Sequence, residues 1–188
     1  MIPRMTLTTA IPNWNANGVL PPIAPGVAGN SPNRSPYLVG LPEFVDRFSY
    51  SKERIALLDD FLCFRGELHR QGLRFGFQWL NGSFLENIEV IEDRFPGDLD
   101  FVTFYTMPKT TSQQSLLGHL RALGKADIYV VQLDDPDYVG NIRLITYWYS
   151  MWAHRRNGLW KGFLQVDLDS TSDKEARNIL NAKKEILQ

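Results

Sequence analysis

The chain of 188 residues has little cysteine and no long apolar run. Its single cysteine, Cys63, excludes an intramolecular disulfide and favours a reducing compartment. The apolar helical pattern around Cys63 predicts that this thiol is a core residue. No stretch approaches about 18 uninterrupted apolar residues, and the first residues lack the apolar segment of a secretory signal. We therefore expect a cytoplasmic protein with no membrane partner.

An excess of positive charge is also missing. Twenty basic residues against 21 acidic residues leave a net charge of −1, so no global basic field indicates a nucleic-acid binder. The three histidines, His69, His119 and His154, lack the spacing of zinc ligands. With 44% hydrophobic and 22% charged residues, the composition is that of a globular domain long enough to bury a core.

The N-terminal residues differ in composition from the rest of the chain. Residues 11–40 contain six prolines and four glycines, which discourage long helices and strands. Apolar residues such as Trp14, Leu20 and Tyr37 favour packing on a folded body over disorder. We expect residues 1–40 to form an extended arm packed on the body, and residues 41–188 to form one domain.

Apolar periodicity predicts the remaining elements. Ser51 is a suitable N-cap for a long helix, and Gly72 a suitable stop. The fold class is therefore α/β (α+β), with a mixed sheet of about four strands flanked by helices. Strands are expected at residues 75–80, 98–105, 125–133 and 161–168. Helices are expected at 41–48, from 52 to about 71, 115–123, 141–156 and 173–188, with a weak helix or loop at 84–91.

Polar residues occur in a fixed order around three of these strands. Gly82 and Ser83 follow the first, Asp98 and Asp100 open the second, and Asp127 lies near the start of the third. Side chains two apart on a strand share a face, roughly 6 to 7 Å apart, so Asp98 and Asp100 can share one divalent cation. Without a cation or a basic partner they would repel each other.

Three carboxylates around Mg²⁺ are suited to phosphoryl-type transfer. Gly82 lets the backbone approach a phosphate, while Ser83 and adjacent N–H groups can bind an anion. Each feature also has a structural alternative: Asp98 and Asp100 as a cap or a solvated pair, Asp127 as a solvated acid at a strand edge, and Gly82-Ser83 as a plain turn.

The acidic residues have other interpretations. An Asp-x-Asp motif also occurs in haloacid dehalogenases and in sugar-nucleotide glycosyltransferases, but there the acids follow an apolar strand. Here "RFPG" precedes the pair and the apolar run follows it, which argues against both classes. Asp134, Asp135 and Asp137 favour a solvated turn over a second metal site.

A basic and aromatic segment lies near the end of the domain. His154, Arg155, Arg156 and Lys161 could line a phosphate or acceptor site, and we select Lys161 as a nucleotide-binding residue. The aromatic residues around them could stack a base or RNA, or could simply form core. These aromatic residues are Tyr147, Trp148, Tyr149, Trp152 and Trp160.

The order of these motifs resembles the polymerase-beta-type nucleotidyltransferase superfamily. Residues 16–168 resemble a family of small, uncharacterised prokaryotic proteins with that minimal fold, through "QWLNGSFLEN", "FPGDLDFVTFY", "KADIYVV" and "YWYSMWAHRRNGLWKGFLQVDL". The resemblance implies that Gly82 and Ser83 contact phosphate and that Asp98, Asp100 and Asp127 are catalytic ligands of Mg²⁺ or Mn²⁺. It implies transfer of a nucleoside monophosphate from an NTP to a protein, RNA or small-molecule acceptor.

The chain departs from that family's pattern in two ways. Glu86 and Asn87 stand where many minimal members have basic or small residues, and no separate helical domain is present to grip the base and acceptor. The alternative hypothesis is therefore a non-catalytic binding module of the same fold, such as the antitoxin or regulatory half of a toxin-antitoxin or phage-defence pair, which would bind a partner protein.

Overall fold

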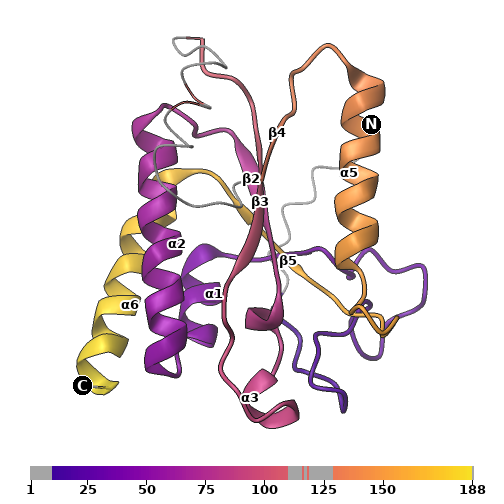
Figure 1. Cartoon of the computed structure of the whole chain (residues 1–188), viewed down its shortest axis with the longest axis vertical. Helices are drawn as coiled ribbons and strands as arrows, with labels where there is room; N and C mark the ends of the chain where they lie inside the picture. Colours follow the sequence, from indigo (N-terminus) through magenta and orange to yellow (C-terminus); the bar gives the residue numbers. More distant parts are fainter. Residues whose placement is uncertain (1–9, 110–115, 117, 119–128, 188) are drawn as a thin grey trace.

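A five-stranded mixed sheet forms the centre of the molecule (Figure 1). The structure is a computed structural model that describes residues 10–109, 116, 118 and 129–187. The strand order is β1-β5-β2-β3-β4. The strands are β1 (Tyr37–Leu38), β2 (Gly76–Asn81), β3 (Asp100–Tyr105), β4 (Tyr129–Gln132) and β5 (Leu164–Asp167).

The strand directions confirm a mixed α and β architecture. β2 is antiparallel to both β3 and β5, whereas β1 is parallel to β5 and β4 is parallel to β3. β3 therefore pairs on both sides, as expected for a strand that is apolar on both faces. The expectation of four strands was wrong, because the fifth, β1, comes from the proline-rich arm. Its two residues are too few to show an alternating pattern and form a strand only by pairing with β5.

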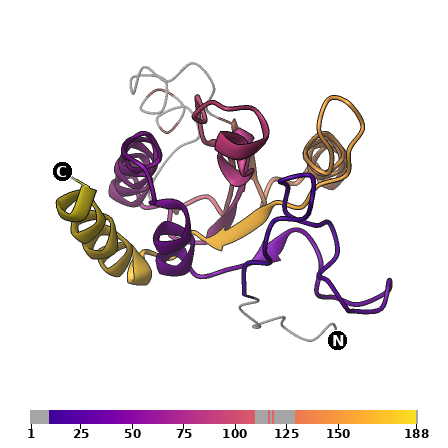
Figure 2. The ribbon, with the colours of Figure 1, turned by 90° about the horizontal axis from the view of Figure 1, so that it is seen from below.

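Helices cover the two faces of the sheet unequally. Three helices pack together on one face, while α5 (Tyr138–Trp152) lies on the other with the arm below it (Figures 1 and 2). The three are α1 (Leu41–Phe48), α2 (Lys52–Arg70) and α6 (Asp173–Leu187). A short 3₁₀ turn (Ser83–Leu85) and α3 (Ile88–Ile91) connect β2 to β3, and a second 3₁₀ turn (Ser170–Ser172) precedes α6. Of the helix predicted at 115–123, only Leu116 and Gly118 lie within the described residues.

The long helix α2 has the predicted boundaries. The Ser51 hydroxyl accepts a hydrogen bond from the Arg54 backbone N–H, which is the expected N-cap. Gly72 follows the helix with a φ of 86°, a conformation that favours glycine. One prediction for α2 was wrong: Cys63 is exposed, because the buried stripe runs along the other side of the helix through residues such as Phe61, Leu62 and Leu68.

The arm packs on the loop that follows β2. Val19 and Leu20 are buried. The Trp14 indole donates to the Leu85 carbonyl at 2.7 Å, and the Asn87 N–H donates to the Gly18 carbonyl at 2.8 Å. Because these bonds join positions about 70 residues apart, the arm supports the backbone of the Ser83–Leu85 turn. In the described part of the chain, no helix is both long and apolar enough to span a bilayer.

Candidate functional site

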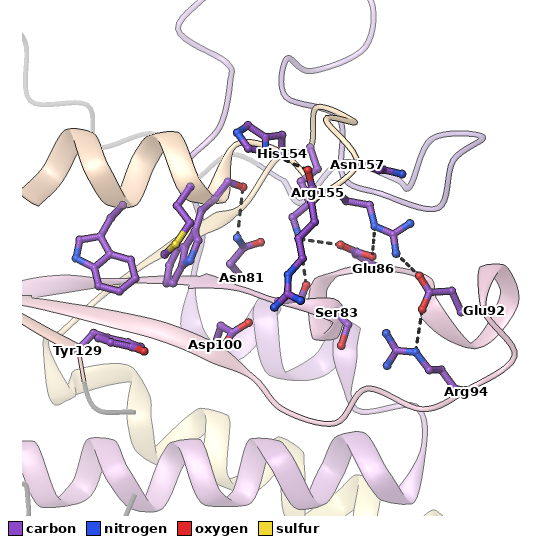
Figure 3. Close-up of a pocket in the computed structure, with 16 residues that line it drawn as sticks. Asn81, Ser83, Glu86, Glu92, Arg94, Asp100, Tyr129, His154, Arg155 and Asn157 are labelled. Carbon is purple, nitrogen blue, oxygen red and sulfur yellow. Dashed lines mark hydrogen bonds and ion pairs between the residues drawn. The ribbon is translucent and has the colours of Figure 1, made fainter. Parts of the chain in front are cut away.

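A pocket of about 810 Å³ opens where β2 ends and β3 begins (Figure 3). Its floor comes from residues 81–83 and Asp100, and its other walls come from Glu86, from Glu92 and Arg94, from Tyr129 of β4, and from the C-terminal end of α5 with the loop that follows it. Segments from four parts of the chain therefore meet there. Gly82, Ser83, Asp100 and Lys161, all predicted from the sequence as site residues, line this pocket.

The close contact between Gly82 and Asp100 sets the floor of the pocket. Asn81 pairs directly with Asp100 across β2 and β3, so the turn begins beside the acid. Gly82 has a φ of 83°, and a Cβ atom at this position would lie 2.5 Å from Asp100 Oδ2. Only glycine satisfies both constraints. Gly82 and Ser83, which are separated from Asp100 in the sequence, therefore lie close to it in the fold.

Asp98 lies differently from Asp100. β3 starts at Asp100, not at Asp98, and Asp98 is exposed in the segment before the strand, outside the set of residues that line the pocket. The third predicted carboxylate, Asp127, lies outside the described residues. Across residues 10–109 and 129–187, no group of three or more His, Cys, Asp or Glu side chains is arranged to hold a metal ion.

The pocket nonetheless contains side-chain oxygen atoms of the kind that bind a magnesium ion. Mg²⁺ is usually held by one or two carboxylates together with water and substrate phosphates, so a complete protein cage is not required. Asp100 supplies one carboxylate in the pocket. Asn81 Oδ1 is buried and accepts no hydrogen bond, while its amide Nδ2 donates to the Trp152 carbonyl at 3.3 Å. A buried oxygen without a hydrogen bond can accept one from a metal-bound water or from an N–H or O–H group of a ligand.

Lys161 is held by an acid. Its side chain is only 7% exposed, and its Nζ lies 2.7 Å from Glu86 Oε1 and 3.4 Å from the Gly82 carbonyl oxygen. Lys161 therefore reaches the turn predicted to bind phosphate, but its charge is balanced by Glu86. The sequence marks Glu86 as unusual, but this pairing spans 75 residues and could not be predicted from a local pattern.

A second acid, Glu92, forms ion pairs with two arginines that line the pocket. Glu92 accepts from Arg94 Nε at 2.8 Å and also pairs with Arg155, whose Nε lies 3.3 Å from Glu86 Oε2. Hydrogen bonds from Arg155 and Arg94 lower the pKa of Glu92, so this acid stays ionised near neutral pH. Arg155 and Arg94 pair with Glu86 or Glu92 (Figure 3), and Lys161 pairs with Glu86.

Arg54 supports the turn from beneath, a role that the sequence did not predict. It is fully buried, and its guanidinium donates to the carbonyls of Phe84 at 2.6 Å and Glu86 at 2.9 Å. It also forms a two-pronged ion pair with Glu89, at 2.6 and 2.9 Å. The only sequence signal was a charged residue on the buried stripe of α2. These bonds fix the backbone that carries Ser83.

The aromatic residues of α5 divide between core and pocket wall. Trp148 and Trp152 are buried and line the pocket, and the Tyr129 ring lies 4.6 Å from that of Trp148. Tyr147 and Tyr149 are exposed, as is Trp160 in the following loop. Trp148 and Trp152 thus serve as core and as pocket wall at once, since one face packs and another borders the cavity.

Comparison with known families shows where this chain belongs. Residues 12–167 match a family of unknown function, DUF6932. The chain belongs to this DUF6932 family. The matched range contains most of the arm, from residue 12, together with the five strands and every described residue that lines the pocket, whereas α6 lies beyond it. No curated protein and no solved structure matches the chain.

Proposed function

We propose that the chain is a Mg²⁺-dependent nucleotidyltransferase of the polymerase-beta type. The observation that carries this proposal is the contact between the Gly82 turn and the Asp100 side chain at the floor of an open pocket. A turn that admits phosphate and a carboxylate that suits Mg²⁺ are thereby adjacent. Arginines and tryptophans on the remaining walls match the phosphates and the base of a nucleotide.

The proposed roles combine the positions of the pocket residues with the sequence motif, which alone assigns Asp98 and Asp127. Asp100, with Asp98 and Asp127, would hold Mg²⁺ or Mn²⁺, which neutralises the phosphate charge when bound. Ser83 and the N–H groups of its turn would orient the phosphates, and Trp148 and Tyr129 would border the base. Asn81 Oδ1 would accept a hydrogen bond from a bound donor. Lys161 would act on the turn through the Gly82 carbonyl.

The direct test is label transfer. Protein would be incubated with each α-labelled NTP, Mg²⁺ or Mn²⁺ and cell lysate, beside the double variant Asp98→Ala/Asp100→Ala. Losing a metal ligand should reduce the rate by roughly a hundredfold or more. Asp46→Ala is the matched control, since Asp46 is an exposed acid on α1 whose partner is Lys183. Label that persists in the double variant would sink the proposal.

One observation favours the alternative of a non-catalytic binding module. Glu86 and Glu92 occupy the cations that a triphosphate would use. In that case the pocket would present a surface with balanced positive and negative charges to a protein partner, such as the toxin or effector half of a defence pair. A stoichiometric partner that co-purifies, together with no nucleotide binding, would support this function over transfer.

A further inference from the structure

We propose that two copies of this chain pair through α5 in an antiparallel, two-fold arrangement. The inference rests on an exposed apolar stripe of this helix and on the charges at its two ends. It does not require the function proposed for the pocket, because the stripe and the pocket-lining residues of α5 lie on different flanks of the helix, although Arg156 at the proposed interface also lines the pocket.

The stripe consists of Val139, Ile142, Thr146 and Tyr149. Their spacing of three, four and three residues places them along one side of a helix, as in the seam of a coiled coil. Val139 is 59% exposed, Ile142 62% and Tyr149 39%, and Thr146 is also exposed. Only Trp148 and Trp152 of α5 are buried. Met151, which lines the pocket, lies on the other flank.

The exposed area is suited to a protein interface. Tyr138, 73% exposed, extends the stripe at its N-terminal end. At about 150 to 250 Å² for a full aromatic side chain, Tyr138, Val139, Ile142 and Tyr149 leave roughly 500 Å² of side chain exposed. A patch of this size lies in the upper part of the roughly 300 to 600 Å² found for the largest patch on a monomer, and such patches are often functional. It would supply more than half of the roughly 800 Å² per partner of a standard interface.

Charge favours a second copy as the occupant. Residues 138–152 contain one charged residue, Arg143, so the stripe lacks the acidic or basic partners that would select a charged protein. The ends of α5 differ: Asp134, Asp135 and Asp137 precede the helix, and Arg156 follows it, while the neighbouring Arg155 is held by Glu86 and Glu92. In an antiparallel pair, the acidic start of one helix meets the basic end of the other. The helix dipoles are also opposed in this arrangement.

The same pairing defines the position of the axis. A two-fold interface is isologous, so the acidic start of one helix lies near the basic segment that follows the other, and the reverse contact repeats it. The axis then passes near the middle of α5 (Tyr138–Trp152). Thr146 is the stripe residue nearest that middle. Thr146 should therefore meet Thr146 of the second copy.

The first test is oligomeric state by sedimentation velocity over a roughly hundredfold concentration range. We expect the wild-type chain to dimerise reversibly, and Ile142→Asp to weaken the dimer at least tenfold, as expected for an apolar residue buried in an interface. Ile186→Asp is the matched control, because Ile186 is 77% exposed on α6, and it should dimerise like wild type. Circular dichroism would confirm that both variants fold.

The second test is disulfide trapping in a Cys63→Ser background. Thr146→Cys should cross-link rapidly, since a disulfide needs Cα atoms about 4.4 to 6.8 Å apart. Ser150→Cys should not, because one turn from the axis the two copies separate by roughly 10 Å. A wild-type chain that stays monomeric at every concentration would overturn the proposal, and so would a dimer that survives Ile142→Asp. Equal cross-linking at both positions would overturn the antiparallel arrangement.

Discussion

Two buried polar networks in this protein differ in how completely they are satisfied. In the helical layer, Arg65 is fully buried and donates to Gln78 at 2.6 Å and to Asp173 at 2.7 Å, as well as to two backbone carbonyls. In the pocket, Asn81 Oδ1 and Glu86 Oε2 are buried without a hydrogen bond, although Glu86 Oε2 lies near Arg155.

The difference distinguishes a structural network from a site. A buried acceptor without a partner is destabilising by about 1 to 3 kcal/mol, so it persists only where the surrounding fold compensates or where a ligand completes it. Arg65 joins α2, β2 and α6 and leaves nothing for a ligand to complete. The pocket combines its incomplete bonds with a glycine of positive φ, and unusual backbone conformations are common at functional sites.

The largest expected effect is on the complete network. Arg65→Met would remove the hydrogen bonds that Gln78 and Asp173 accept from the guanidinium. It should lower the free energy of unfolding by about 3 to 5 kcal/mol, measured by denaturant titration. Arg70→Met is the control, because the Arg70 side chain is 72% exposed and pairs with Glu67 on the same helix. That change should stay within about 0.5 kcal/mol. Similar values for the two variants would remove the contrast between buried and exposed arginines.

The next effect is on the floor of the pocket. Gly82→Ala forces an L-residue to a φ of 83° and places its Cβ against Asp100. We expect a loss of about 1 to 3 kcal/mol in unfolding free energy and loss of Mg²⁺-nucleotide binding. Gly97→Ala should change neither quantity, since a Cβ added at Gly97 would meet no atom within 4 Å. Binding retained by Gly82→Ala would show that the Gly82–Asp100 contact is not needed.

Features that depend on residues close together in the sequence were predicted, whereas features that depend on residues far apart in the sequence were not. The Ser51 cap and α2 depend on neighbours within a turn, so they were predicted. β1 and the pairing of Glu86 with Lys161 depend on partners far along the chain and were not predicted. The start of β3 at Asp100 is set by register with Asn81, which no local pattern reports.

A smaller effect, which depends on pH, is expected for the ion pair between Glu89 and the buried Arg54. Burial by itself would raise the pKa of Glu89, but hydrogen bonds from Arg54 outweigh it and leave this pKa below its usual value of 4.5. The folded state therefore binds fewer protons than the unfolded state in that range, so Glu89 stabilises the fold above about pH 4.5 and the stabilisation is lost as pH falls. Glu89→Gln should be less stable than wild type at neutral pH, and the difference should shrink in acid.

Denaturant titrations of both proteins between neutral pH and about pH 3 would measure this change. A stability difference between wild type and Glu89→Gln that is constant across the range would contradict the assignment of an ionised Glu89 beside Arg54.

The smallest expected effect is at the pocket mouth. Glu92→Gln removes the charge that engages Arg94 and Arg155, so an anionic ligand should bind a few-fold more tightly, equivalent to less than about 1 kcal/mol. Stability should stay within about 0.5 kcal/mol because this pair is exposed. Glu53→Gln, an exposed acid in the first turn of α2, is the control. Weaker binding by Glu92→Gln would mean that Glu92 itself contacts the ligand.

Calorimetric titration of Mg²⁺ with a non-hydrolysable NTP analogue tests the central claim most directly, because it requires no knowledge of the acceptor. The account predicts stoichiometric binding to the wild-type chain that requires Mg²⁺ and is lost in Asp100→Asn, while Asp46→Asn binds normally. No binding of any nucleotide by the folded wild-type chain, or binding that survives Asp100→Asn unchanged, would contradict it.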